Sequence, residues 1–371
     1  MSYRQKIRIF AIKKEESMKR ICIVAGARPN FVKVSPLMRA ISKTEHDCKL
    51  VYAGREDDPT LEDSLFEDLQ MACPDYYLGV DSQRLNEITS RVMAEFDNLL
   101  NKYAADVVIV VDDLASTMAA AIVTKKRGIA LAHLVAGTRS FDINMPKEIN
   151  RLVIDALSDY LFTAGARSNS VALREQADAA NNTYMVGNIL MDTLRFNYDR
   201  LQRPAIMDEL KLKEGEYIVL TLNRKALLAD RDTLKQLLEK LLEAGVDIVA
   251  PLRGDTSKVV NELCHSDKLH IVDALPYLDF GWTAAHARAI VTDSGNVAEE
   301  ATFNHVPCMT LNDYTEHMET VTVGTNELIG GDAERLGEAL AKLKRGEWKQ
   351  GELPERWDGR TADRIVQILT K

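Results

Sequence analysis

Segments that place charged or hydroxyl side chains directly after an apolar run are the first candidates for chemistry in this chain. AGARPNFVK (25–33) follows one such run and opens a helical pattern, with Gly26 permitting a tight turn. Arg28 and Lys33 add positive charge to the anion-favouring N-terminus of that helix. The segment could contact phosphate, or it could be a structural turn with solvated charges. Because the pattern is not GxGxxG, the dinucleotide fingerprint is absent.

VTDSGNVAEEA (291–301) has the same order of strand, turn and helix further along the chain. Ser294 and Gly295 fall at the turn, where a hydroxyl group and backbone N–H groups could bind phosphate. Glu299 and Glu300 follow about one turn into the helix. A carboxylate there could accept both hydroxyls of a ribose. The alternative is that both only complement the helix dipole.

GTRSFDINMPKEINR (137–151) crosses a polar loop and predicts a helix that begins at Pro146. The apolar residues that should form its buried stripe are Ile149, Leu152, Val153, Ala156 and Leu157. Lys147 lies in the first turn, where the macrodipole disfavours a cation, and Arg151 repels it further. Lys147 is therefore either a surface residue or a residue held by an anion.

DYTEHMETVTVGTN (313–326) places His317 beside Glu316 and Glu319 after a strand. A histidine near two carboxylates could transfer protons, although a solvated loop residue would have the same pattern. The sequence shows no nucleophilic-triad spacing, no Walker motif and no zinc-ligand spacing, so we expect no metal site.

Composition sets the class of protein that must position these segments. With 371 residues, 46% hydrophobic and 28% charged, the chain is typical of a globular protein of two domains. A net charge of −9 argues against a nucleic-acid partner. No apolar run approaches 18 residues, so we expect no membrane span. The five scattered cysteines, odd in number, predict buried, reduced thiols in a cytoplasmic protein: Cys22, Cys48, Cys73, Cys264 and Cys308.

Short β-branched runs alternate with amphipathic helical patterns along the chain. The strand candidates are residues 20–26, 48–54, 106–113, 129–137, 160–165, 183–187, 217–223, 247–252, 269–275, 289–295, 307–311 and 326–331. Near-continuous apolar strands separated by helices predict parallel sheets covered on both faces. We therefore expect an α/β fold with two Rossmann-like, doubly wound domains that face a central cleft at the carboxyl ends of their strands.

The same pattern suggests domain boundaries. We expect an N-terminal extension over 1–17, a first Rossmann-like domain over 18–187 and a crossover segment over 188–214. A second, nucleotide-binding domain should cover 215–355, and a C-terminal helix over 356–371 could pack back on the first domain.

Taken in order, these motifs resemble the non-hydrolysing UDP-N-acetylglucosamine 2-epimerases over essentially the whole of residues 18–370. GARPNFVKVSPL resembles that family's G-x-R-P-x-x-x-K-x-x-P-L, and DVVIVVDDLAST resembles its D-V-x-V-x-G-D-x-x-S-T segment. The resemblance implies the glycosyltransferase-B architecture. It also implies interconversion of UDP-GlcNAc and UDP-ManNAc by elimination and re-addition of UDP, with no metal or nicotinamide cofactor, in a cytoplasmic homodimer.

The resemblance also implies site residues. Those matching the UDP-sugar contacts are Arg28, Lys33, Arg139, Ser294, Gly295 and Glu300. Asp112 matches one catalytic carboxylate, and Lys147 and Glu148 are further candidates for proton transfer.

Three acid–base positions of the family hold other residues here. The glutamate of H-x-E-A-G-x-R-S is Val135, the first glutamate of M-P-E-E-x-N-R is Lys147, and the histidine of T-x-H-R is Asn223. The two glutamate losses shift the charge of the site by about +3, and each lost acid–base group typically costs about 10²–10⁴-fold in rate. Further departures from the family's T-G-Q-H, H-P-R-T, D-S-G-G and E-R-P-E patterns are Ala53, Arg55, Glu56, Arg253, Gly254, Asp255, Asn296, His317 and Met318.

Three functions follow from this pattern. The first is a UDP-sugar-binding protein without epimerase activity, which could sense a nucleotide sugar or pair with an active paralogue. The second is an active enzyme that uses substitute residues, with Lys147 as a base of lowered pKa, a partner such as Asp112, Glu148 or His317, and an acidic sugar as substrate. The third is ordinary epimerase activity, which would leave Asp112 and unrecognised residues to do nearly all of the proton transfer.

Overall fold

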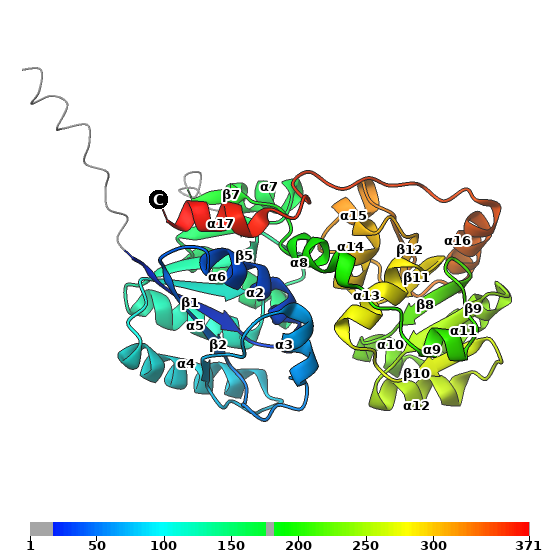
Figure 1. Ribbon diagram of the computed structural model, residues 1–371, viewed down its shortest axis with the longest axis horizontal. Helices are drawn as coiled ribbons and strands as arrows, with labels where there is room; N and C mark the ends of the chain where they lie inside the picture. Colours follow the sequence, from blue (N-terminus) through cyan, green and yellow to red (C-terminus); the bar gives the residue numbers. More distant parts are fainter. Residues whose placement is uncertain (1–17, 176–181, 371) are drawn as a thin grey trace, which may run out of the picture.

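Two parallel sheets, one in each half of the chain, organise the computed structural model, which describes residues 18–175 and 182–370. Within these residues the first sheet has the order β3-β2-β1-β4-β5-β6-β7 and the second has the order β10-β9-β8-β11-β12-β13. Figure 1 shows the sheets as the centres of two lobes, with helices on both faces. The predicted fold class is confirmed.

The strands of the first sheet are β1 (Arg20–Ala25), β2 (Asp47–Tyr52), β3 (Tyr76–Tyr77), β4 (Val107–Val111), β5 (Ala130–Ala136), β6 (Tyr160–Thr163) and β7 (Thr183–Met185). Those of the second are β8 (Tyr217–Thr221), β9 (Asp247–Pro251), β10 (Leu269–Val272), β11 (Ala289–Thr292), β12 (Cys308–Thr310) and β13 (Asn326–Leu328). Every strand but β3 coincides with a predicted run. β3 is two residues long at a sheet edge, too short to give an alternating pattern.

The helices before the second sheet are α2 (Arg28–Ile41), α3 (Asp63–Leu69), α4 (Leu85–Lys102), α5 (Ala115–Lys126), α6 (Pro146–Leu157), α7 (Ala166–Glu175), α8 (Leu190–Asn197) and α9 (Ile206–Glu209). A short 3₁₀ helix, η2 (Tyr198–Arg200), joins α8 to α9. The remaining helices are α10 (Lys225–Ala229), α11 (Arg231–Glu243), α12 (Gly254–Leu263), α13 (Tyr277–Ala285), α14 (Gly295–Phe303), α15 (Glu319–Thr322), α16 (Ala333–Arg345) and α17 (Thr361–Leu369).

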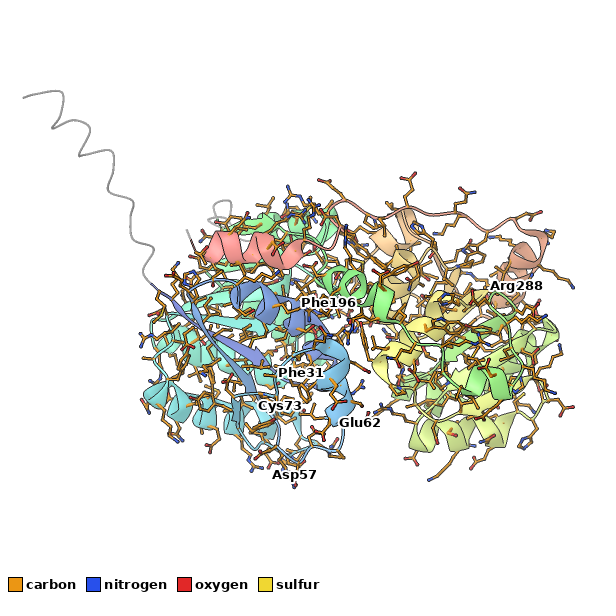
Figure 2. The ribbon with its side chains drawn as sticks, in the orientation of Figure 1. Phe31, Asp57, Glu62, Cys73, Phe196 and Arg288 are labelled. Atoms are coloured by element: carbon orange, nitrogen blue, oxygen red, sulfur yellow. The ribbon has the colours of Figure 1, made fainter. Side chains whose placement is uncertain are left out.

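The strands are apolar throughout because helices cover both faces of each sheet. All five residues of β4 are buried, and the same is true of β8 and most of β1. On one face, α2 packs its apolar residues against the sheet, with Phe31 buried in the core of the first lobe (Figure 2).

The strand order of each sheet reverses direction at one point, between β1 and β4 in the first and between β8 and β11 in the second. In open α/β sheets the crevice at such a point, outside the carboxyl ends of the strands, is the usual ligand site. The segments that follow these four strands contain Lys33, Asp113, Arg224 and Ser294, and all four residues line one cavity between the lobes. The topology therefore brings together the charged segments singled out in the sequence.

The C-terminal segment returns to the first lobe. Figure 1 shows α17 lying beside α2 on the first lobe, at the end of a long loop that leads back from the second lobe. Ile365, Val366 and Leu369 of α17 belong to the core formed by β1, α2 and β4. The Asp192 carboxylate of α8 accepts the backbone N–H groups of Thr361 and Ala362 and so holds the first turn of α17.

The predicted buried stripe of α6 is wrong. The helix begins at Pro146 as expected, but Ile149 is 47% exposed and Leu152 is 36% exposed. The inner face instead carries Ile154 and the polar residues Glu148, Asn150, Arg151 and Asp155. The spacing of apolar residues predicted the wrong buried face, because α6 directs its polar residues at the cavity and at the buried ends of β4 and β5.

Two remaining expectations concern the ends of the chain and the membrane. The N-terminal extension over 1–17 lies outside the described residues. Among the residues that the structure describes, no helix is long and apolar enough to span a membrane.

Candidate functional site

A cavity of about 430 Å³ lies between the two lobes. Its first wall is built by the residues that follow β1, β4 and β5 together with the first turns of α6. Its second wall is built by the residues that follow β8, β11 and β12. Charged and polar side chains together form most of both walls, so the cavity suits a polar, charged ligand more than an apolar one.

Lys33 and Asp112 form an ion pair on the first wall. The Lys33 Nζ lies 2.6 Å from one Asp112 carboxylate oxygen, and the Asn30 amide donates to the other at 2.7 Å. Burial lowers the pKa of Lys33, but the neighbouring Asp112 outweighs it and leaves that pKa raised. Lys33 is therefore a fixed cation, already neutralised within the protein.

In the turn before α2, the Asn30 side chain already binds two backbone N–H groups, so neither can bind an anion. The Asn30 Oδ1 accepts the N–H groups of Gly26 at 2.8 Å and Ala27 at 3.1 Å. Gly26 is needed for close approach, since a Cβ there would meet the Ser116 Oγ at 2.1 Å. This part of the AGARPNFVK segment is therefore a structural turn.

Arg28 lies outside the cavity lining. Its guanidinium is half-buried at the edge between the lobes, where burial and the neighbouring Arg253 lower its pKa. Arg253 in turn lies 3.7 Å from the carboxylate of Glu62, labelled in Figure 2 on the side of the first lobe that faces the second. A direct contact between Arg28 and a ligand stays a prediction.

Asp113 is the centre of a second charged network on the first wall. Its carboxylate lies 3.2 Å from the Lys147 Nζ and 2.7 Å from the Arg151 Nε. Arg151 also pairs with Glu148 on α6 and with Glu316 of the second lobe. Burial raises the pKa of Asp113, but Lys147 and Arg151 outweigh it and leave the pKa below its ordinary value.

The geometry favours Asp113, and not Asp112, as the counterpart of the aspartate in the G-D-x-x-S-T segment. Counting back three residues from Ser116 places that aspartate at Asp113 and its glycine at Asp112. The φ of Asp112 is +60°, in the left-handed region that glycine adopts readily. A catalytic role for Asp112 stays a prediction, and Asp113 is a second candidate for the carboxylate of that segment.

A β-bulge aims Val135 into the cavity. The pairing of β5 with β6 shifts register between Leu134 and Ala136, and Val135 has a φ of +73°. A positive φ is a strained conformation for a β-branched residue. The bulge thus directs an apolar side chain at the place where the resemblance expects a glutamate.

His133 is buried at the back of the cavity between two oxygen acceptors. Its Nδ1 lies 2.5 Å from the Asp155 carboxylate and its Nε2 lies 3.0 Å from the Asp112 carbonyl oxygen. Burial raises the pKa of Asp155, but His133 and Arg139 outweigh it and leave the pKa lowered. Both ring nitrogens are engaged, so His133 holds the ends of β4 and β5 together and has no free nitrogen for a ligand.

Arg139 and Glu148, two of the predicted site residues, face away from the cavity. The Arg139 guanidinium lies 2.7 Å from the Asp155 carboxylate and also binds Glu175. Glu148 accepts the N–H groups of Ser140 at 2.8 Å and Phe141 at 3.1 Å. Burial raises the pKa of Glu148, but these hydrogen bonds outweigh it and leave the pKa lowered. Both residues therefore shape the loop before α6.

Ser294 and Gly295 line the second wall at the N-terminus of α14, as predicted. No atom lies within 4 Å of a Cβ built on Gly295, so a ligand can approach the backbone there. The Arg224 guanidinium is held nearby, with its Nε on the Asp293 carbonyl oxygen at 3.0 Å and its charge over the Tyr314 ring. A helix N-terminus beside an arginine is a suitable diphosphate site.

The two glutamates of α14 point in different directions. Glu299 lines the cavity, where its carboxylate accepts the Asn188 amide at 2.8 Å and lies 3.1 Å from the His317 Nε2. Glu300 lies outside the cavity lining, near Tyr277, whose hydroxyl is buried, and burial together with Glu299 raises the pKa of Glu300 to about 8. A ribose contact by Glu300 stays a prediction.

Sequence reasoning left out Asp113, Arg224 and Tyr314 as ligand-facing residues. The spacing before Ser116 could have identified Asp113. Nothing in the sequence showed that Tyr314 would lie under the Arg224 guanidinium. Among the described residues, no group of three or more histidine, cysteine, aspartate or glutamate side chains is arranged to hold a metal ion.

Comparison with known proteins agrees with this geometry. The sequence profile described as UDP-N-acetylglucosamine 2-epimerase matches residues 39–370. A UDP-N-acetylglucosamine 2-epimerase of Methanocaldococcus jannaschii is 34% identical over 367 residues, which cover 95% of this chain and 99% of that protein. This chain belongs to the UDP-N-acetylglucosamine 2-epimerase family.

A further relative and a solved structure are similar to this chain over almost their full length. The UDP-2,3-diacetamido-2,3-dideoxy-D-glucuronate 2-epimerase of Pseudomonas aeruginosa is 31% identical, with 95% of this chain and 99% of that protein covered. The crystal structure of the M. jannaschii epimerase in complex with UDP-GlcNAc and UDP superposes with a TM-score of 0.85 at 32% identity, covering 95% and 99% of the two chains. The epimerase architecture is thus complete in this chain.

Val135, Lys147 and Asn223 all line the cavity, at three positions where the sequence resemblance expects acid–base groups. Val135 cannot transfer a proton and Asn223 cannot titrate. Lys147 replaces a carboxylate with a cation that is 55% exposed.

Proposed function

We propose that this chain binds a UDP-sugar in the cavity between its lobes and does not epimerise UDP-GlcNAc. The observation that carries the proposal is the contrast between the two walls. The second wall keeps a diphosphate site, formed by the N-terminus of α14 and Arg224. The first wall has Val135 and Lys147 where epimerisation needs carboxylates.

Three carboxylates that line the cavity are held by cations. Asp112 is paired with Lys33, Asp113 with Lys147 and Arg151, and Glu316 with Arg151. The hydrogen at C2 of the sugar is barely acidic, so its removal needs a base whose pKa is raised toward neutrality. A carboxylate held by cations has the opposite shift, as the lowered pKa of Asp113 illustrates.

Binding of UDP is supported by charges that the protein leaves available. Arg224 is the one Lys or Arg of the described cavity lining for which no carboxylate lies within ion-pair distance. The α14 N-terminus adds backbone N–H groups directed at the same space. The M. jannaschii relative was solved with UDP-GlcNAc and UDP, which supports the same ligand class here.

Calorimetric titration with UDP and UDP-GlcNAc, followed by product analysis, tests the proposal. We expect binding of both ligands, and no UDP-ManNAc or free UDP after prolonged incubation with UDP-GlcNAc. Arg224→Met should weaken binding of UDP by about tenfold or more, because a charge-assisted contact is lost. Turnover of UDP-GlcNAc by the purified protein would overturn the proposal.

A second candidate is an active enzyme with substitute residues. Lys147 and Asp113 lie 3.2 Å apart in the cavity and could exchange a proton with each other. If this pair performs catalysis, Lys147→Met should abolish turnover of whichever nucleotide sugar is the substrate. Full activity of that variant would remove the main support for this candidate.

The assembly state and the location of the protein are also proposed from the family. We propose a cytoplasmic homodimer, or a heteromer with an active paralogue. Light scattering of the purified protein, alone and mixed with such a paralogue, distinguishes these states by mass.

A further inference from the structure

Asp112 has a left-handed backbone conformation and a carboxylate in contact with two other side chains. The fold itself does not require a carboxylate at this position. The Asp112 φ of +60° belongs to the left-handed region, which costs an aspartate more than a glycine. The family pattern has glycine at this position, so the backbone path is available without a side chain. The side chain that is present points its carboxylate at Lys33 and Asn30, at 2.6 and 2.7 Å.

Lys33 and Asn30 would form an anion site if Asp112 had no carboxylate. Both lie in the cavity lining and are buried, with exposed fractions of 7% and 2%. A buried ammonium without a partner strongly favours an incoming anion, because leaving the charge unpaired is costly. The Asp112 carboxylate therefore occupies the place that a ligand's acidic group would otherwise take.

The remaining charged side chains on this side of the cavity also disfavour an acidic sugar. If the diphosphate is held by Arg224 and the N-terminus of α14, the sugar must face the other side chains of the lining. Five carboxylates face three Lys or Arg cations there: Asp112, Asp113, Asp293, Glu299 and Glu316 against Lys33, Lys147 and Arg151. The two histidines of the lining are held by carboxylates of their own, His133 by Asp155 and His317 by Glu299.

We propose that Asp112 is a specificity-determining residue: its carboxylate is an internal anion that fills the Lys33–Asn30 donor pair. The cavity therefore accepts nucleotide sugars whose sugar is uncharged and rejects sugar acids. This inference rests on the proposed function, because it concerns the sugar end of the same UDP-sugar site.

Titration calorimetry with UDP, UDP-GlcNAc and UDP-glucuronic acid tests the inference. The wild-type protein should bind UDP-GlcNAc about tenfold or more tightly than UDP-glucuronic acid, since like charges disfavour the acid. Asp112→Asn keeps the size of the side chain and tolerates the left-handed conformation, but frees the charge of Lys33. It should bind UDP-glucuronic acid as tightly as UDP-GlcNAc or more tightly, with the affinity for UDP unchanged.

The double variant Lys33→Met with Asp112→Asn is the matched control. It removes the freed cation together with the internal anion, so it should lose the gain in affinity for UDP-glucuronic acid. Equal binding of both sugars by the wild type would overturn the inference, as would an Asp112→Asn effect of the same size on all three ligands. Absence of UDP binding by the wild type would instead overturn the proposed function, and the inference with it.

Discussion

Single residues decide the chemistry of this cavity. Val135 is aimed into it by a bulge and is held at a φ of +73°, a conformation that costs a β-branched residue about 1–3 kcal/mol. The protein thus retains the strained backbone that would present a base, while the side chain it presents is inert. Asn223, in the second wall, has only its backbone N–H engaged with Asp293 and adds no titratable group.

Restoring the three acid–base groups should restore chemistry. We predict that Val135→Glu, Lys147→Glu and Asn223→His together produce measurable epimerisation of UDP-GlcNAc, since each such group typically contributes about 10²–10⁴-fold. The bulge and the diphosphate site are already in place for these side chains. Product analysis after incubation with UDP-GlcNAc provides the measurement.

The matched control for this gain places alanine at the same three positions. It changes the volume of the cavity without adding acid–base groups, so it should bind UDP and give no product. If the restored variant binds UDP-GlcNAc and still gives no product, the loss of activity lies elsewhere than in these three residues.

Which segments form the site could be predicted from the sequence, but not which side chains face the ligand. Lys33, Lys147, Ser294 and Gly295 were predicted and line the cavity. Arg139 was predicted and does not, because the buried Asp155 turns it inward. Such inward ion pairs depend on neighbours far away in the sequence, so a local pattern cannot reveal them.

At the scale of elements, the apolar strands were predictable and the faces of the cavity helices were not. Strand positions follow from burial on both sheet faces, which leaves a continuous apolar run. The α6 helix breaks the usual pattern because its inner face satisfies the polar ends of β4, and the Asn150 amide donates to the Asp113 carbonyl oxygen at 2.8 Å. Its apolar residues consequently point outward, as the exposure of Ile149 shows.

Glu300 of α14 gives a pH dependence of stability with a definite sign. Burial and Glu299 raise its pKa from 4.5 to about 8 in the folded protein. As pH rises above about 4.5, the unfolded chain loses this proton and the folded chain does not, so stability falls until about pH 8. Glu300→Gln should therefore raise the free energy of unfolding at pH 8 by roughly 3–5 kcal/mol and leave it unchanged at pH 4.

Urea unfolding at the two pH values measures this effect. Glu338→Gln is a suitable control, because Glu338 is exposed on α16. It should change the free energy of unfolding by no more than about 0.5 kcal/mol at either pH. A Glu300→Gln effect that is equal at pH 4 and pH 8 would contradict the assignment of a raised pKa.

At the scale of the whole molecule, the C-terminal segment ties its own lobe back to the first one. Trp357 is buried, packs on Leu190 and Met191 of α8, and donates its indole N–H to the Ala164 carbonyl oxygen at 3.1 Å. Because α8 also contacts α2 and α14, the segment after residue 355 packs where the two lobes meet. The sequence could suggest this return, but not the residue that anchors it.

Removing the Trp357 side chain should lower the stability of the folded protein. We predict that Trp357→Ala lowers the free energy of unfolding by about 3–5 kcal/mol, as expected for a fully buried aromatic residue. Trp348→Ala should cost less, because Trp348 is only half-buried at the edge of the second core, although its indole also donates to a carbonyl oxygen. Equal losses for both variants in urea unfolding would contradict the anchoring role of Trp357.

The central claim is that a complete epimerase architecture binds its nucleotide sugar without removing the hydrogen at C2. Proton NMR of the purified protein with UDP-GlcNAc in D₂O tests it most directly, because the C2 signal reports proton removal even when no product accumulates. We predict that the ligand lines broaden, showing binding, while the C2 signal keeps its full intensity. Loss of the C2 signal through exchange with deuterium would contradict the account.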